Sequence, residues 1–210
     1  ASEYRNDPRY PQQFDPSHMF FSEINMEVDS FEYKGKTGEM VLNIRQLAGV
    51  EQSGLTITET QGRVEMDTLS LTVPHLHMKT ADSDLTVAYR MDMNAFDEVN
   101  PGTFSLIGEG QIGKGDVIFF TRMGGPDTKD VCTTLNRQLS VRPMEVQLKA
   151  EGNLETLNVP QLHLKAPGLA VVDGSVTLWD VANDLSLKTN LKAKDAHGAS
   201  IDLDGGYVMA

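Results

Sequence analysis

Strict alternation between apolar side chains and polar or small ones is the property of this sequence that most restricts its fold. The apolar members of the clearest run are Leu85, Val87, Tyr89, Met91 and Met93. A period of two residues is that of a β-strand and differs from the 3.6-residue period of a helix. The run therefore predicts a strand with one apolar face and one polar face.

The same alternation returns at residues 69–73, 144–150 and 185–193, and turn-forming sequences rich in Gly, Asn, Asp and Pro separate such segments. Only residues 127–138 show a helical signal, with Asp127 as a possible cap and Val131 and Leu135 on a shared face. The sequence predicts an all-β, mainly antiparallel fold with at most one short helix. A curved, groove-shaped sheet and a β-sandwich fit the alternation equally well.

An internal repeat links the two halves of the chain. Residues 73–79 (VPHLHMK) match residues 159–165 (VPQLHLK) at five of seven positions, and a Gly-x-apolar-Glu block precedes each copy. In both copies the apolar positions shift by one residue at the proline, a residue that favours a sheet edge, a strand start or a β-bulge. We therefore expect a sheet that bends twice in the same way.

The predicted domain organisation follows from this repeat. Residues 18–210 are expected to form a single repeated β-domain, with the two copies spanning residues 62–93 and 152–191. Residues 1–17 contain three prolines and no alternation, so they are expected to be an extended, linker-like segment.

Charge and cysteine content exclude several function classes. The chain has 18 Lys and Arg against 30 Asp and Glu, a net charge of −12, which repels nucleic acid. Lipid stays possible, because acyl chains are recognised by apolar area. Cys132 is the only cysteine, so no intrachain disulfide can form, and a small buried apolar group is the expected role of its thiol.

Three segments resemble the AsmA-like and TamB-like envelope proteins, particularly those of the Bacteroidetes type. The matching segments are residues 42–47 with 51–55, residues 152–159 with 162–165 (a G-x-L-x-x-L-x-V unit), and residues 91–96 with 113–120. The resemblance covers roughly residues 18–210. It implies a long taco-shaped sheet in the periplasm, whose apolar groove carries phospholipid between the inner and outer membranes.

The resemblance also implies an inner-membrane anchor, and no apolar run in this sequence approaches the roughly 20 residues that a membrane-spanning helix needs. We therefore expect an internal fragment that meets the membrane only through segments outside this chain. The family has no catalytic residues, so neither enzymatic activity nor a cofactor is expected. The predicted groove lining is Leu85, Val87, Tyr89, Met91, Met93, Leu162, Leu164, Leu185, Leu187 and Leu191.

A second hypothesis is a scaffold for outer-membrane protein biogenesis that binds partner strands, for example those of an outer-membrane β-barrel assembly protein, at its sheet edges. Unpaired edges would also allow two copies to form an edge-to-edge homodimer.

Two further motifs could indicate ligands. His75 and His77 would leave the same face of a strand, a spacing that can hold zinc or copper, but the second copy has Gln161 in place of His75 and no third ligand is evident. Residues 108–113 satisfy G-x-G-x-x-G after a predicted strand. Dinucleotide binding needs a helix that starts at these glycines, and residues 116–120 are predicted not to be helical, which favours a hairpin.

Overall fold

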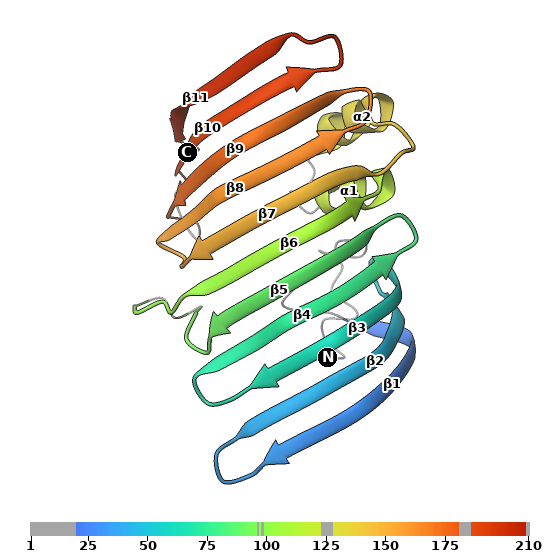
Figure 1. Ribbon diagram of the computed structural model, residues 1–210, viewed down its shortest axis with the longest axis vertical. Helices are drawn as coiled ribbons and strands as arrows, with labels where there is room; N and C mark the ends of the chain where they lie inside the picture. The colour runs from blue at the N-terminus through green and yellow to red at the C-terminus, as the bar shows by residue number, and fades with distance from the viewer. Residues whose placement is uncertain (1–19, 96, 98, 123–127, 181–185, 209–210) are drawn as a thin grey trace.

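The computed structural model describes residues 20–95, 97, 99–122, 128–180 and 186–208. Within this part of the chain, one 11-stranded sheet has its strands in sequence order, and every neighbouring pair is antiparallel (Figure 1). The predicted all-β fold is confirmed. No second sheet is present in the described residues, so the fold is not a sandwich. The predicted linker at residues 1–17 lies outside the described ranges.

The strands and helices have the following bounds: β1 Phe21–Lys34, β2 Glu39–Glu51, β3 Thr56–Met66, β4 Ser70–Thr80, β5 Asp84–Asp92, β6 Phe104–Ile112, α1 Lys114–Thr121, α2 Lys129–Gln138, β7 Met144–Gly152, β8 Thr156–Ala166, β9 Ala170–Trp179, β10 Ser186–Asp195 and β11 Ser200–Val208. Among the described residues, neither helix has the length and apolar character needed to cross a membrane.

The described residues contain two helices where at most one was expected, and the prediction that residues 116–120 are not helical is wrong. The β-branched and aromatic side chains of residues 117–120 favour a strand by propensity. Contacts from another part of the chain, however, fix the start of α1. The Asp116 carboxylate accepts hydrogen bonds from the hydroxyls of Thr80 and Ser83, and the Gly115 N–H donates to Asp82. These tertiary contacts override the local preference.

Helix α2 confirms the helical signal but not its details. Thr128 occupies the N-cap position, and Asp127 lies outside the described residues. Val131 and Leu135 do not share the buried face, because Val131 is 50% exposed while Leu135 packs against the core. The buried stripe runs through Cys132 and Leu135, three residues apart. Cys132 itself is buried, as expected.

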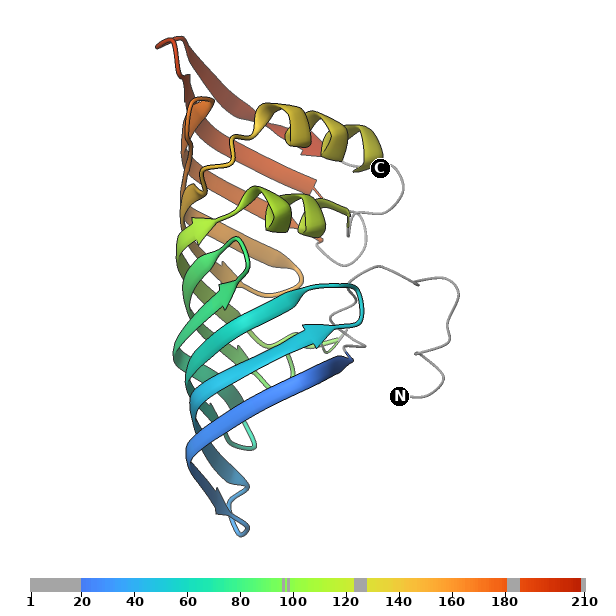
Figure 2. The ribbon, with the colours of Figure 1, turned by 90° about the vertical axis from the view of Figure 1, so that its right-hand side faces the viewer.

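The sheet is strongly curved, and the two helices lie on its concave side (Figure 2). Val117 and Leu135 from the helices pack with Leu139, Met144 and other residues in a small buried cluster. The remaining members of this cluster are Leu164, Ala166 and Leu169. Because Met144, Leu164 and Ala166 belong to β7 and β8, the face that carries them is the concave face.

Cross-strand register identifies the other residues of the concave face, because directly paired residues point to the same side. One row of such pairs crosses the middle of the sheet from β2 to β11. We call it the floor row, and its members are Ile44, Gly62, Leu76, Val87, Gly108, Leu148, Leu162, Gly174, Leu191 and Leu203.

Of the outcomes expected at the two prolines, the structure has a register shift inside a strand in both places. The β4–β5 register shifts between Val73 and Leu76, and the β8–β9 register shifts between Val159 and Leu162. Each shift returns the apolar side chains to the concave face beyond the proline. The glycine blocks ahead of the two motifs are not equivalent, because Gly62 pairs with Leu76, whereas Gly152 pairs with Leu157 on the other side of the second proline.

Glycines allow the strands to approach closely where the sheet bends. At Gly62 (φ +158°) and Gly174 (φ +154°), a Cβ atom would overlap a backbone carbonyl oxygen of the neighbouring strand. Only glycine adopts such a conformation without strain. Both glycines belong to the floor row, so the same residue type produces the same local geometry in β3 and β9.

Candidate functional site

Within the described residues, the concave face carries one charged side chain between the Met40–Ile44 part of β2 and Ile201 and Leu203 on β11. This is Asp195 at the end of β10, which pairs with Ala170 on the same face. The apolar members of this face on the central strands are Leu71, Val73, Leu76, Met78, Leu85, Val87, Tyr89, Met91, Phe104, Leu106, Met144, Val146, Leu148, Leu157, Val159, Leu162 and Leu164. Charged groups of these strands lie on the convex face. The concave face is therefore suited to contact with an uncharged, apolar ligand.

Eight of the ten predicted lining residues lie on the concave face. They are Leu85, Val87, Tyr89 and Met91 on β5, Leu162 and Leu164 on β8, and Leu187 and Leu191 on β10. Met93 follows the end of β5 in a turn and is 49% exposed. Leu185 lies outside the described residues.

Most of the floor row remains partly accessible. Val87, Leu148, Leu162 and Leu191 are half-buried, although each occupies the middle of a strand that has neighbours on both sides. In a sandwich, a second sheet would bury such residues completely. The part of the chain that the structure describes forms instead an open trough with an apolar floor.

The helices close part of this trough. Leu164 packs against the buried cluster beneath α1 and α2, so it does not line the open part as the sequence predicted. Periodicity within β8 could not show this, because the residues that cover Leu164 come from the segment between β6 and β7. Leu85, Val87, Tyr89 and Met91 do not belong to that cluster.

One polar group lies on the concave face of β5. The Tyr89 hydroxyl donates a hydrogen bond to the Met91 sulfur at 3.1 Å, and partial burial raises the pKa of the Tyr89 phenol above its usual value. The phenol therefore stays uncharged at neutral pH and adds no charge to the face.

Gly108 forms a gap in the middle of the floor. It lies between Val87 on β5 and Leu148 on β7, and a Cβ atom added there would meet nothing within 4 Å. Unlike Gly62 and Gly174, it is not required by a close backbone approach. A glycine inside a central strand is destabilising relative to alanine, and such a residue can mark a place where a ligand approaches the backbone.

Sequence reasoning missed several members of the concave face: Met40, Leu42, Ile44, Val64, Met66, Phe104, Leu106, Val172, Val176 and Leu178. In β6 the alternation starts at Phe104 but is interrupted by Gly108 and Gly110. In β9 the adjacent apolar residues Val171 and Val172 interrupt the two-residue alternation of apolar and polar side chains. Counting glycine as a concave-face residue would have extended the strand predicted before Gly108 over the whole of β6 and would have revealed β9.

The convex face carries two histidine–carboxylate pairs. His77 Nε2 lies 2.6 Å from Asp84 Oδ1, and His163 Nδ1 lies 2.5 Å from Asp173 Oδ1. The His77 imidazole is therefore bound to Asp84 and does not form a ligand set with the exposed His75. The described residues contain no group of three His, Cys, Asp or Glu side chains placed to hold a metal ion.

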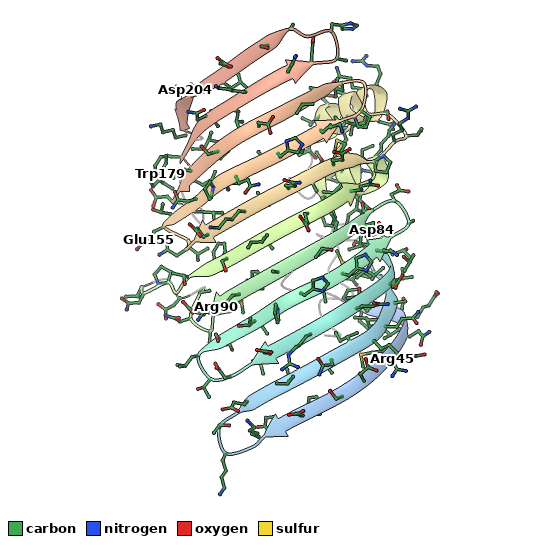
Figure 3. The ribbon with its side chains drawn as sticks, in the orientation of Figure 1. Arg45, Asp84, Arg90, Glu155, Trp179 and Asp204 are labelled. Carbon is green, nitrogen blue, oxygen red and sulfur yellow. The ribbon has the colours of Figure 1, made fainter. Side chains whose placement is uncertain are left out.

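Figure 3 shows the side chains of the convex surface, with Arg45, Asp84 and Arg90 labelled on β2 and β5. Arg45 pairs with Asp29 on β1, and Arg90 Nη1 lies 3.1 Å from Asp92 Oδ1. Solvent-exposed ion pairs of this kind make the convex face polar.

The G-x-G-x-x-G segment does not form a phosphate-binding loop. Gly108 and Gly110 lie within β6, and only Gly113 lies at the start of α1. The N–H groups that could meet a phosphate already have partners, because Gly113 donates to the Ser83 hydroxyl and Gly115 to the Asp82 carboxylate. A protein carboxylate thus takes the place that an anion would need.

No known family, curated protein or solved structure matches this chain.

Proposed function

We propose that this chain is a non-enzymatic segment of an envelope lipid-transport protein, and that its concave face shelters phospholipid acyl chains between the inner and outer membranes. The observation that carries the proposal is an apolar face, uncharged except at Asp195, that spans most of an 11-stranded sheet and has no second sheet over it among the described residues. A soluble protein rarely leaves such a surface open unless another molecule covers it.

The physical basis for lipid binding is area. Each methylene buried against the floor contributes about 0.8 kcal/mol, so an acyl chain can bind without a directed polar contact. The floor row runs across the strands, along the length of the sheet. A chain lying on it would contact residues such as Val87, Leu148 and Leu162, with Gly108 giving it room near the backbone.

Native mass spectrometry of the purified protein after incubation with phospholipid vesicles tests the proposal. We expect lipid adducts on the wild-type chain and a marked loss of adducts for Gly108→Phe, whose side chain would fill the trough. Gly108→Ala, which adds one methyl group, serves as the matched control. A wild-type chain that carries no lipid would contradict the proposal.

An assembly module is the second candidate, and the geometry of β11 favours it. β11 pairs with β10 through nine residue pairs without a register shift, and its outer edge has no neighbour within the described residues. A straight edge of this kind can accept a partner strand. If this is the function, a proline at Asp204, on the convex side of this edge strand, should reduce activity more than a charge on the floor at Val87.

A further inference from the structure

The segment between β6 and β7 has a charge opposite to that of the rest of the protein. Residues 113–143 contain five Lys and Arg against three Asp and Glu, whereas the remaining residues contain 13 and 27. The segment thus has a net charge of +2 on a chain whose other parts sum to −14. It also contains both helices.

The basic side chains of this segment are available to a partner. Arg122, Lys129, Arg137 and Arg142 are exposed, and none forms an ion pair within the described part of the chain. Many sheet cations are already neutralised, as in the pairs of Lys149 with Glu151 and of Lys165 with Glu145.

The acidic side chains of the segment oppose this charge only in part. Asp116 is turned toward the β4–β5 turn, where Thr80 and Ser83 bind it. Asp130 is exposed on α2, and Asp127 lies outside the described residues. Four exposed cations therefore face solvent with one described exposed carboxylate among them.

Exposed apolar side chains accompany these cations. Phe120 is 43% exposed, Val131 is 50% exposed and Val141 is 92% exposed. Helix α1 contains four consecutive large apolar residues, 117–120, which cannot all face the sheet because successive residues are about 100° apart. Of these four, Val117 packs against the buried cluster.

The two helices project from the concave side of the sheet, beyond the strands that they cover (Figure 2). Their surface is therefore presented on the side toward which the trough opens. Acidic side chains of the central strands, such as Asp84, Glu109 and Glu145, lie on the convex face, and salt screens their repulsion over a Debye length of about 8 to 10 Å.

We propose that the segment between β6 and β7 docks on an anionic phospholipid bilayer surface. Lys and Arg side chains meet lipid headgroups while neighbouring aromatic and aliphatic side chains enter the interface, and this combination is typical of interfacial helices. The occupant follows from charge complementarity together with the exposed apolar side chains. This inference adds to the proposed function a site where the trough meets its lipid source, and it gives this chain a membrane contact that the sequence did not lead us to expect.

Co-sedimentation with vesicles tests the docking. We expect binding to vesicles of equal parts phosphatidylcholine and phosphatidylglycerol, and much weaker binding to phosphatidylcholine alone. Combining Arg122→Gln, Lys129→Gln, Arg137→Gln and Arg142→Gln should weaken binding to the anionic vesicles by at least about 100-fold, because each cation near an anionic surface contributes roughly fivefold. Phe120→Ser with Val141→Ser should also weaken binding.

Lys188→Gln, Lys192→Gln and Lys194→Gln form the matched control, since these exposed lysines lie on the convex face of β10. Circular dichroism verifies that each variant is folded. Equal binding of both vesicle types, no binding, or an equal loss in the β10 control would overturn the inference, as would binding of an acidic protein in place of vesicles. Gly108→Phe separates the two proposals, because it should empty the trough and leave docking unchanged.

Discussion

The imidazole of His163 faces the carboxylate of Asp173 across strands β8 and β9, with 2.5 Å between Nδ1 and Oδ1. His77 and Asp84 make the corresponding contact between β4 and β5. Both histidines follow a proline bulge at the same distance in the sequence, and both pairs lie on the convex face. The sequence repeat thus also repeats the register shift at the proline and a histidine–carboxylate contact, although Asp173 is directly opposite His163 and Asp84 is diagonal to His77.

The pair of Asp84 and His77 predicts an acid-sensitive contribution to stability. The hydrogen bond from His77 lowers the pKa of Asp84 from 3.8, with further lowering from the charges of His77 and Lys79. A lowered pKa means that this contribution is present above the unfolded-state pKa and is lost as the pH falls through the folded-state pKa. Asp84→Asn should therefore lower Tm at neutral pH, and the difference from wild type should shrink below pH 3.8.

Thermal melts followed by circular dichroism across this pH range measure the effect. Asp202→Asn is the control, because Asp202 is exposed and has no hydrogen bond or ion pair within the described residues. A difference between Asp84→Asn and wild type that persists unchanged in strong acid would contradict the assignment.

The two kinds of floor glycine should respond differently to alanine. At Gly174 the new Cβ would overlap the Asn190 carbonyl oxygen at a φ of +154°, so we expect Gly174→Ala to destabilise the fold by about 1 to 3 kcal/mol. At Gly108 the Cβ meets open space, and alanine should stabilise the fold by about 0.4 to 1 kcal/mol. Urea unfolding measures both changes, and equal losses would refute the distinction.

A charge on the floor should prevent lipid binding without unfolding the protein. Val87→Arg places a guanidinium on the apolar face, where an acyl chain cannot solvate it. Thr86→Arg adds the same group one residue away on the convex face, opposite Glu109. Native mass spectrometry should show lipid adducts for Thr86→Arg and few for Val87→Arg, and equal adducts on both would mean that the two faces are equivalent.

Edge pairing should produce dimers at high protein concentration. The outer edge of β11 is regular, whereas β1 has three register shifts in its pairing with β2, and bulges of this kind protect an edge. We therefore expect association through β11 and its suppression by Leu203→Lys. Light scattering checks both expectations, and a wild-type monomer at high concentration would refute them.

The strand pattern and the bulges could be predicted because each depends on local chemistry. Alternation identified β5 and β10, and the parity change at Pro74 and Pro160 located both register shifts. Period two directly determines which side chains share a face. For this reason, every described residue among the predicted lining set is on the concave face except Met93, which lies beyond the end of its strand.

Helix α1 and the cover over Leu164 could not be predicted, because both depend on contacts distant in sequence. The helix start is fixed by Asp82 and Ser83, about 30 residues before it, and nothing in residues 114–121 reveals this. Nor could alternation distinguish a trough from a sandwich, since both need one apolar face per strand. That choice depends on what lies above the face.

Site-specific photocrosslinking tests the central claim most directly. A photoreactive amino acid is placed at Val87 on the floor or at Thr86 on the convex face, and the protein is irradiated in the presence of phospholipid vesicles. The trough account predicts lipid adducts at position 87 and few or none at position 86. Adducts at both positions to the same extent, or none at position 87, would contradict it.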